Sequence, residues 1–143
     1  MTEQILSPKM LGYWTEETLK EVPDDSGIYC VFRAATDPET EEMDVQELLY
    51  VGEHRSARFG LTHDEHRDRW HAFPPPDEEI WYAVGLCGNA NRERLAAAMI
   101  NAHKPRFNAD SEYLDRFPFD ATTVHLYGKK HKLQSIFSVE RHD

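Results

Sequence analysis

The fold of this chain is constrained most by three short apolar segments with the character of β-strands, at residues 28–32, 48–52 and 80–86. In the first and third segments the side chains alternate with a period of two, which is typical of strands. Residues 35–46 lie between the first two segments and are mostly acidic and polar, as in an exposed hairpin loop. We therefore expect a hairpin followed by a third strand. In the first strand one face carries Ile28, Cys30 and Phe32, and the other carries Tyr29 and Val31.

Helical signals separate the second strand from the third and follow the third. The tetrad Thr62-His63-Asp64-Glu65 has the form of a capping box and predicts a helix over residues 63–72, which Pro74 to Pro76 end. Asn89 or Asn91 is expected to cap a second helix that runs to His103. Weaker patterns predict a helix after Thr15, a short helix at 111–117 and a strand at 122–127.

Length and composition favour one compact domain over residues 1–143 in the mixed α/β class, with an α+β arrangement. The sequence has neither a secretory signal nor a run of about 18 apolar residues, so we expect a cytoplasmic protein that crosses no membrane. Cys30 and Cys87 lie in apolar runs and are expected to be reduced. The sequence leaves the oligomeric state open.

The net charge of −10 argues against a broad electrostatic surface for nucleic acid, so any such contact requires a local basic patch. Lys129, Lys130 and Lys132 form the densest basic run and are candidate contacts to a DNA backbone. His54, His63, His66 and His71 do not have the spacing of a zinc motif.

Three motifs occur in order along the predicted elements. Gly27-Ile28-Tyr29 begins the first strand, Tyr50-Val51-Gly52 ends the second, and Lys104-Pro105-Arg106-Phe107-Asn108 follows the last helix. With these motifs the chain resembles the GIY-YIG nucleases over residues 22–108. The resemblance implies a β-β-α-β-α core with a three-stranded antiparallel sheet flanked by helices. Residues 109–143 would be a C-terminal extension.

The resemblance also implies that Mg²⁺ or Mn²⁺ supports hydrolysis of DNA phosphodiester bonds. Tyr29 would be the general base or its hydrogen-bond partner, Tyr50 would position the attacking water, and Asn108 would brace the site. Because a phenol has an ordinary pKa of about 10, the first of these roles requires help from a nearby cation or metal-bound water.

The arginine of the family would bind the phosphate and stand on the first helix. Arg69, which precedes a large apolar residue, fits this position best, and Arg67 and Arg58 are alternatives. Arg67 and His71 are four residues apart on one helical face, a spacing that would let both reach one phosphate. Arg55 and Arg58 are further candidates for DNA contact.

The family places its metal-binding glutamate nine residues before the motif proline, and here that position holds Ala96. A methyl group cannot bind Mg²⁺, which requires oxygen donors. Three explanations stay open: a natural pseudo-nuclease, replacement of the missing carboxylate by Glu93 one turn earlier, or an inactivating substitution at residue 96. The rival to a nuclease is a non-catalytic module that binds DNA or a protein on the same fold.

Overall fold

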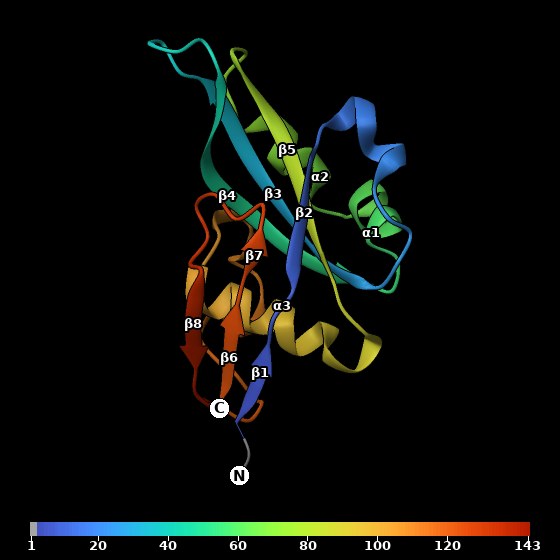
Figure 1. Ribbon diagram of the computed structural model, residues 1–143, viewed down its shortest axis with the longest axis vertical. Coiled ribbons are helices and arrows are strands. Elements are labelled where there is room, and N and C mark those ends of the chain that lie inside the picture. The colour runs from blue at the N-terminus through green and yellow to red at the C-terminus, as the bar shows by residue number, and fades with distance from the viewer. Residues whose placement is uncertain (1–2) are drawn as a thin grey trace.

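A computed structural model describes residues 3–143, so the first two residues of the expected 1–143 domain lie outside it. The chain forms two β-sheets (Figure 1). The strands are β1 (Gln4–Leu6), β2 (Lys9–Trp14), β3 (Gly27–Thr36), β4 (Met43–His54), β5 (Glu78–Leu86), β6 (Thr122–His125), β7 (Tyr127–Gly128) and β8 (Ile136–Val139). The helices are α1 (Ala57–His63), α2 (Arg67–Ala72) and α3 (Asn89–His103), with 3₁₀ turns η1 (Glu16–Glu21), η2 (Arg106–Asn108) and η3 (Glu112–Leu114).

The larger sheet has five strands in the order β4-β3-β5-β2-β7. The mixed α+β class is confirmed, and β4, β3 and β5 are adjacent and antiparallel. The expected three-stranded sheet is nevertheless wrong in extent, because β2 pairs with β5 and β7 adds in parallel to β2. The sequence analysis missed β2 because its six residues, KMLGYW, lack regular alternation.

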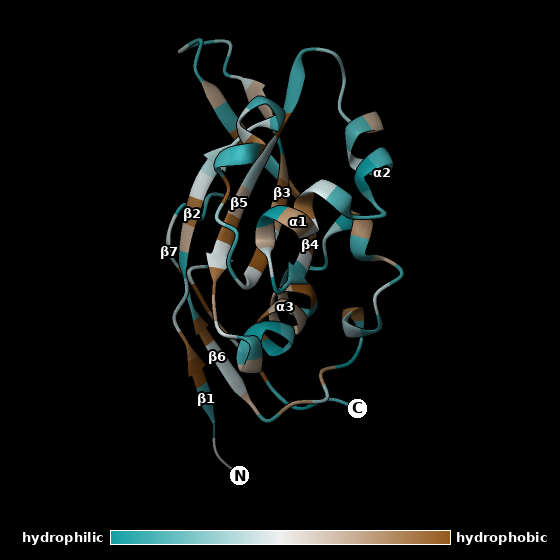
Figure 2. Ribbon diagram, turned by 90° about the vertical axis from the view of Figure 1, so that its right-hand side faces the viewer, coloured by the Kyte–Doolittle hydropathy of each residue, from teal (hydrophilic) through white to brown (hydrophobic). Residues whose placement is uncertain are grey.

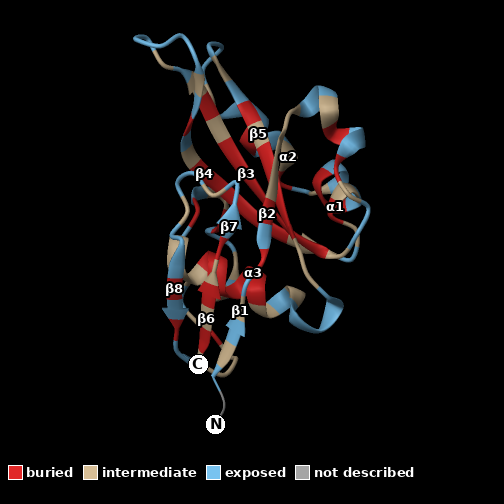
Figure 3. Cartoon of the chain, in the orientation of Figure 1, coloured by how far each residue is buried: buried red, intermediate tan, exposed pale blue. Residues whose placement is uncertain are grey.

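The two faces of β3 enter different cores, as its alternation predicts. Ile28, Cys30 and Phe32 pack with α3 and the smaller sheet. Tyr29 and Val31 pack with α1, α2 and the turn η1. Figure 2 shows hydrophobic residues along the central strands, and Figure 3 shows buried positions running through β3, β4, β5 and α3. The five-stranded sheet is therefore covered on both faces.

The predicted helix over residues 63–72 is wrong, because two short helices replace it. Ser56 rather than Thr62 caps the first, since the Ser56 side chain accepts a hydrogen bond from the Phe59 amide at 3.2 Å. Thr62 lies inside α1 and donates to the carbonyl of Arg58. Asp64 is extended (ψ 135°) and separates the helices. The helix predicted to end at His103 is confirmed as α3. Its N-cap residue is Gly88, so the expectation that Asn89 or Asn91 caps it is wrong.

The C-terminal extension forms most of the smaller sheet. Its order is β1-β6-β8, with β1 parallel to β6 and β8 antiparallel to it. The strand predicted over residues 122–127 is divided between β6 and β7, and the helix predicted at 111–117 is reduced to η3. Strand β1 and the C-terminus lie at the same end of the molecule (Figure 1). Within residues 3–143, no helix combines the length and the apolar composition that crossing a bilayer requires.

Candidate functional site

The site begins at the free edge of the larger sheet, where Asn108 binds strand β4. The Asn108 Oδ1 accepts a hydrogen bond from the Val51 amide at 2.8 Å, and its Nδ2 donates to the Val51 carbonyl at 2.9 Å. Asn108 is only 3% exposed, so one side chain satisfies both polar groups of a buried peptide. This bond pair holds the segment after α3 against the end of β4.

A pocket of about 410 Å³ opens beside this contact. Because β4 is an edge strand, side chains from both layers of the fold reach the pocket. Tyr29 and Tyr50 come from the α1 and α2 side, whereas Ala96 and Ile100 come from α3. The remaining lining residues are Val51, Gly52, Glu53, His66, Glu93, Asn108, Asp110, Ser111, Glu112 and Tyr113. Residues from all three motif regions and from position 96 thus line one pocket.

Gly52, the third residue of the second motif, leaves room for the Tyr29 ring. A Cβ atom at Gly52 would overlap Cε2 and Cζ of that ring. Gly60 on α1 faces the same ring from the other side, where a Cβ would lie 2.5 Å from Tyr29 Cε1. The Tyr29 ring is therefore held between two backbone segments that must be glycine.

We expect Gly52→Ala to displace the Tyr29 ring and to lower the free energy of unfolding by about 1–3 kcal/mol, as overpacked core positions do. Chemical denaturation measures this change. Gly88→Ala is the matched control, because a Cβ there meets no atom within 4 Å. A Gly52→Ala protein that is as stable as Gly88→Ala would contradict the packing described here.

Both tyrosines are hydrogen-bond donors rather than bases at neutral pH. Burial raises the pKa of Tyr29, and the charge of Asp64 raises it further. The Tyr29 hydroxyl donates to Asp64 Oδ2 at 2.5 Å. Burial and the same charge also raise the pKa of Tyr50. These environments disfavour the expected role of Tyr29 as general base. They remain compatible with the alternative role, in which Tyr29 is a hydrogen-bond partner of the base.

His66 lies between two carboxylates and stacks on Tyr50, with ring centroids 4.5 Å apart. Its Nδ1 lies 2.8 Å from Asp64 Oδ1, and its Nε2 lies 3.1 Å from Asp110 Oδ2. Burial lowers the pKa of His66, but the hydrogen bonds to Asp64 and Asp110 outweigh burial and leave the pKa raised above 6.5. The hydrogen bond to His66 in turn lowers the pKa of Asp110.

We expect Asp110→Asn to lower the pKa of His66, because it removes a negative charge that favours the imidazolium. The raised pKa in the folded protein stabilises the fold below about pH 6.5, and this contribution is lost as the pH rises through the folded pKa. Titration of the imidazole by NMR measures the shift, and denaturation against pH should show a smaller loss in Asp110→Asn. The exposed Asp115→Asn is the control. An unchanged His66 pKa in Asp110→Asn would refute the pairing.

The structure places Arg67 and His71 away from this pocket. Arg67 binds the Glu16 carboxylate, and His71 Nε2 lies 3.0 Å from Glu16 Oε2. In the structure both side chains therefore meet a carboxylate of the chain itself. Trp70 is fully buried between them and β5, and Tyr82 donates to the same glutamate at 2.9 Å. The cluster ties α2 to η1.

The other candidate cations also lie outside the pocket lining. Arg69 is exposed and is not among the residues that line the pocket, although its charge helps to lower the pKa of Asp110. Arg58 Nε donates to the Val22 carbonyl at 2.8 Å, which is a structural role. Arg55 lines a separate hollow of about 210 Å³ beside α1. The basic run lies beyond β7: Lys129 and Lys132 are exposed, and Lys130 is half-buried.

The position of the missing glutamate is a buried wall of the pocket. Ala96 is 3% exposed and presents a methyl group. Glu93 lines the same pocket and accepts a hydrogen bond from the Tyr113 hydroxyl. Glu53, a further lining carboxylate, binds Arg92 Nε at 2.7 Å. Carboxylate oxygens are therefore present around the pocket, although Ala96 supplies none.

Asp64, His66 and Asp110 belong to the site, although the sequence does not single them out. Asp64 lies in the tetrad that has the form of a capping box, and His66 is one of four histidines without the spacing of a zinc motif. The cluster Asp64-Glu65-His66 was the available signal, but Asp110 is 44 residues away from His66, and its approach depends on the tertiary fold. No family model matches the chain, and no curated protein or solved structure is significantly similar to it.

Proposed function

We propose that this chain is a GIY-YIG-type domain that hydrolyses DNA phosphodiester bonds in the pocket beside β4. One observation carries the proposal: Tyr29, Tyr50, Asn108 and position 96 are spread over 80 residues of sequence and line the same pocket. Nothing in their local sequence patterns requires them to meet. Their presence in one pocket supports the resemblance independently of the residue types that make up the motifs.

Within this proposal the tyrosines bind and orient rather than deprotonate water. The Tyr29 hydroxyl donates its hydrogen to Asp64, so toward the pocket it can accept a hydrogen bond from the attacking water, whereas the Tyr50 hydroxyl can donate to a phosphate oxygen. A carboxylate that lines the pocket takes the proton from water, and Glu93 is the candidate because it faces the pocket from α3. Asn108 positions the wall through Val51. Arg69, whose charge helps to lower the pKa of Asp110, is the candidate cation for the phosphate.

The pocket also requires a cation before a phosphate can enter. Glu53, Glu93, Asp110 and Glu112 line it, and four carboxylates repel an anionic ligand. A divalent metal, when bound, supplies positive charge to the phosphate and acidity to water. A metal at the family position does not fit this chain, because Ala96 has no donor atom. No step of the proposal therefore depends on residue 96.

We expect Ala96→Glu to raise Mg²⁺-dependent DNA cleavage about tenfold or more, because it adds an oxygen donor to the pocket wall. Plasmid nicking with and without Mg²⁺ measures the effect. Asn91→Glu is the matched control, since it adds the same charge at an exposed position of α3. Equal cleavage by the two variants would show that residue 96 is not part of a metal-dependent site.

The second candidate function is a non-catalytic module that binds DNA or protein. The buried Ala96 methyl favours it, because it removes the carboxylate on which the family's chemistry depends. Salt dependence tests the phosphate contacts: DNA binding that weakens steeply with salt indicates them, and a flat response counts against them.

A further inference from the structure

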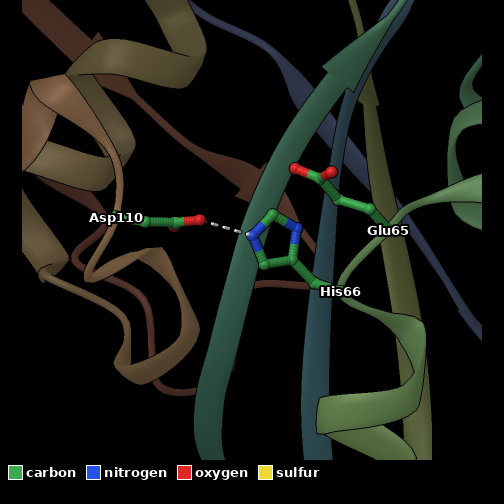
Figure 4. A group of neighbouring side chains, drawn as sticks. All are labelled: Glu65, His66 and Asp110. Carbon is green, nitrogen blue, oxygen red and sulfur yellow. Dashed lines mark hydrogen bonds and ion pairs between the residues drawn. The ribbon is translucent and has the colours of Figure 1, made fainter.

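Three donor side chains meet at the rim of the pocket, between the α1–α2 connection and the segment after η2. A ring nitrogen of His66, a carboxylate oxygen of Asp110 and a carboxylate oxygen of Glu65 all lie within 4.8 Å of one another, and Nε2 of His66 is the nitrogen that faces Asp110. Figure 4 shows Asp110 pointing at the imidazole from the opposite segment, with the Glu65 carboxylate beside the ring. His66 is buried, and both carboxylates are exposed, so the group is open to solvent.

The imidazole is oriented from behind by a fourth residue. Asp64 Oδ1 lies 2.8 Å from His66 Nδ1 and accepts the His66 backbone amide at 2.8 Å. Asp64 is itself held by the Tyr29 hydroxyl, and its side chain is only 6% exposed. In a neutral His66 this contact places the hydrogen on Nδ1 and the lone pair on Nε2, toward Asp110. Histidines that bind metals are commonly held by a carboxylate in this way.

The spacing of the donors suits a six-coordinate ion. With bonds of about 2.1 Å, adjacent donors of an octahedral ion lie about 3.0 Å apart and opposite donors about 4.2 Å apart. The distance from His66 Nε2 to Asp110 Oδ2 is 3.1 Å. The Glu65 oxygen lies within 4.8 Å of both other donors, and Glu65 is exposed and has a long side chain, so rotation about its side-chain bonds can bring the oxygen to the distance that an ion requires.

We propose that Nε2 of His66 and the carboxylates of Asp110 and Glu65 bind a divalent transition metal ion. One nitrogen and two carboxylates form a mixed donor set that suits Mn²⁺ or Zn²⁺ better than Mg²⁺. His66 and Asp110 line the same pocket as Tyr29 and Tyr50, so a metal ion held there would supply the positive charge that Ala96 cannot help to bind. The need for a metal ion rests on the proposed hydrolysis. Metal binding itself can be measured without DNA and therefore independently of cleavage.

Titration of the purified chain with Mn²⁺, followed by electron paramagnetic resonance of the free ion, tests the site. We expect one ion per chain and a loss of affinity of about tenfold or more in Asp110→Asn, which replaces a charged carboxylate ligand with a neutral amide. Glu65→Gln, at an exposed position, should weaken binding in the same direction without affecting the fold. Asp115→Asn is the control and should bind as the unchanged chain does. Equal affinity in all four proteins would overturn the proposal.

Line broadening by Mn²⁺ in NMR spectra locates the ion. The imidazole signals of His66 should broaden at lower Mn²⁺ concentrations than those of the exposed His131. Broadening that starts in the acidic loop of residues 37–42, with His66 unaffected, would place the ion elsewhere and overturn the site. Metal binding at His66 without DNA cleavage would retain this site and remove the proposed hydrolysis. DNA cleavage without metal binding at His66 would retain the proposed hydrolysis and remove this metal site.

Discussion

Replacing Asn108 with alanine is expected to lower the free energy of unfolding by about 2–5 kcal/mol. The change leaves the Val51 amide and carbonyl without their partners in a buried place, and each unsatisfied group costs about 1–3 kcal/mol. Because Val51 lies between Tyr50 and Gly52, the same change should loosen the pocket wall. Urea denaturation of the two proteins measures the loss.

Two further variants control this prediction. Asn91→Ala, at an exposed position of α3, should change the free energy of unfolding by no more than about 1 kcal/mol. Asn108→Asp keeps the acceptor for the Val51 amide but loses the donor for the Val51 carbonyl, so it should also destabilise the fold. An Asn108→Ala protein that matches Asn91→Ala in stability would mean that the end of β4 is held by other contacts.

Replacing Tyr29 with phenylalanine is expected to reduce DNA cleavage about 100-fold or more while the fold persists. The ring stays between Gly52 and Gly60, but the hydroxyl that donates to Asp64 and faces the pocket is lost. Misplacement of a reacting water by about 1 Å typically costs a factor of about 10². Single-turnover cleavage of a labelled oligonucleotide measures the rate, and loss of the hydrogen bond to the buried Asp64 carboxylate should cost about 1.5–3 kcal/mol of stability.

Tyr13→Phe is the matched control for this second prediction. The Tyr13 hydroxyl binds His131 Nδ1 at 2.8 Å, and Tyr13 packs against the opposite core, so its removal should leave cleavage unchanged. If Tyr29→Phe and Tyr13→Phe cleave DNA at the same rate, the Tyr29 hydroxyl takes no part in the reaction.

The central elements of the fold were predictable because their signals are local. Alternation over residues 28–32 correctly assigned Tyr29 and Cys30 to opposite faces, and the helix expected to end at His103 is α3. The strand β2 was not predictable in this way, since its pairing with β5 and β7 depends on the tertiary fold. The division of the 63–72 segment was missed because Ser56 and Thr62 offer competing local caps, and the contacts of Asp64 are decided by Tyr29, 35 residues away.

In the candidate site, too, features set by local sequence were predictable, and contacts between distant parts of the chain were not. The motifs identified Tyr29, Tyr50 and Asn108, which line or brace the pocket. The sequence assigned Arg67 and His71 to a phosphate from their spacing on a helix, but spacing does not say which way a helix face points. In the structure that face meets Glu16. Helical spacing gives the relative direction of two side chains, and packing of the helix gives their partner.

Nicking of supercoiled plasmid DNA by the purified chain in Mn²⁺, in Mg²⁺ and in excess chelator tests whether the pocket beside β4 hydrolyses phosphodiester bonds. We expect nicking in Mn²⁺ that the chelator abolishes and that Tyr29→Phe reduces about 100-fold. If neither the chain nor Ala96→Glu nicks DNA in either metal while both proteins unfold cooperatively, the pocket beside β4 is not a phosphodiesterase site.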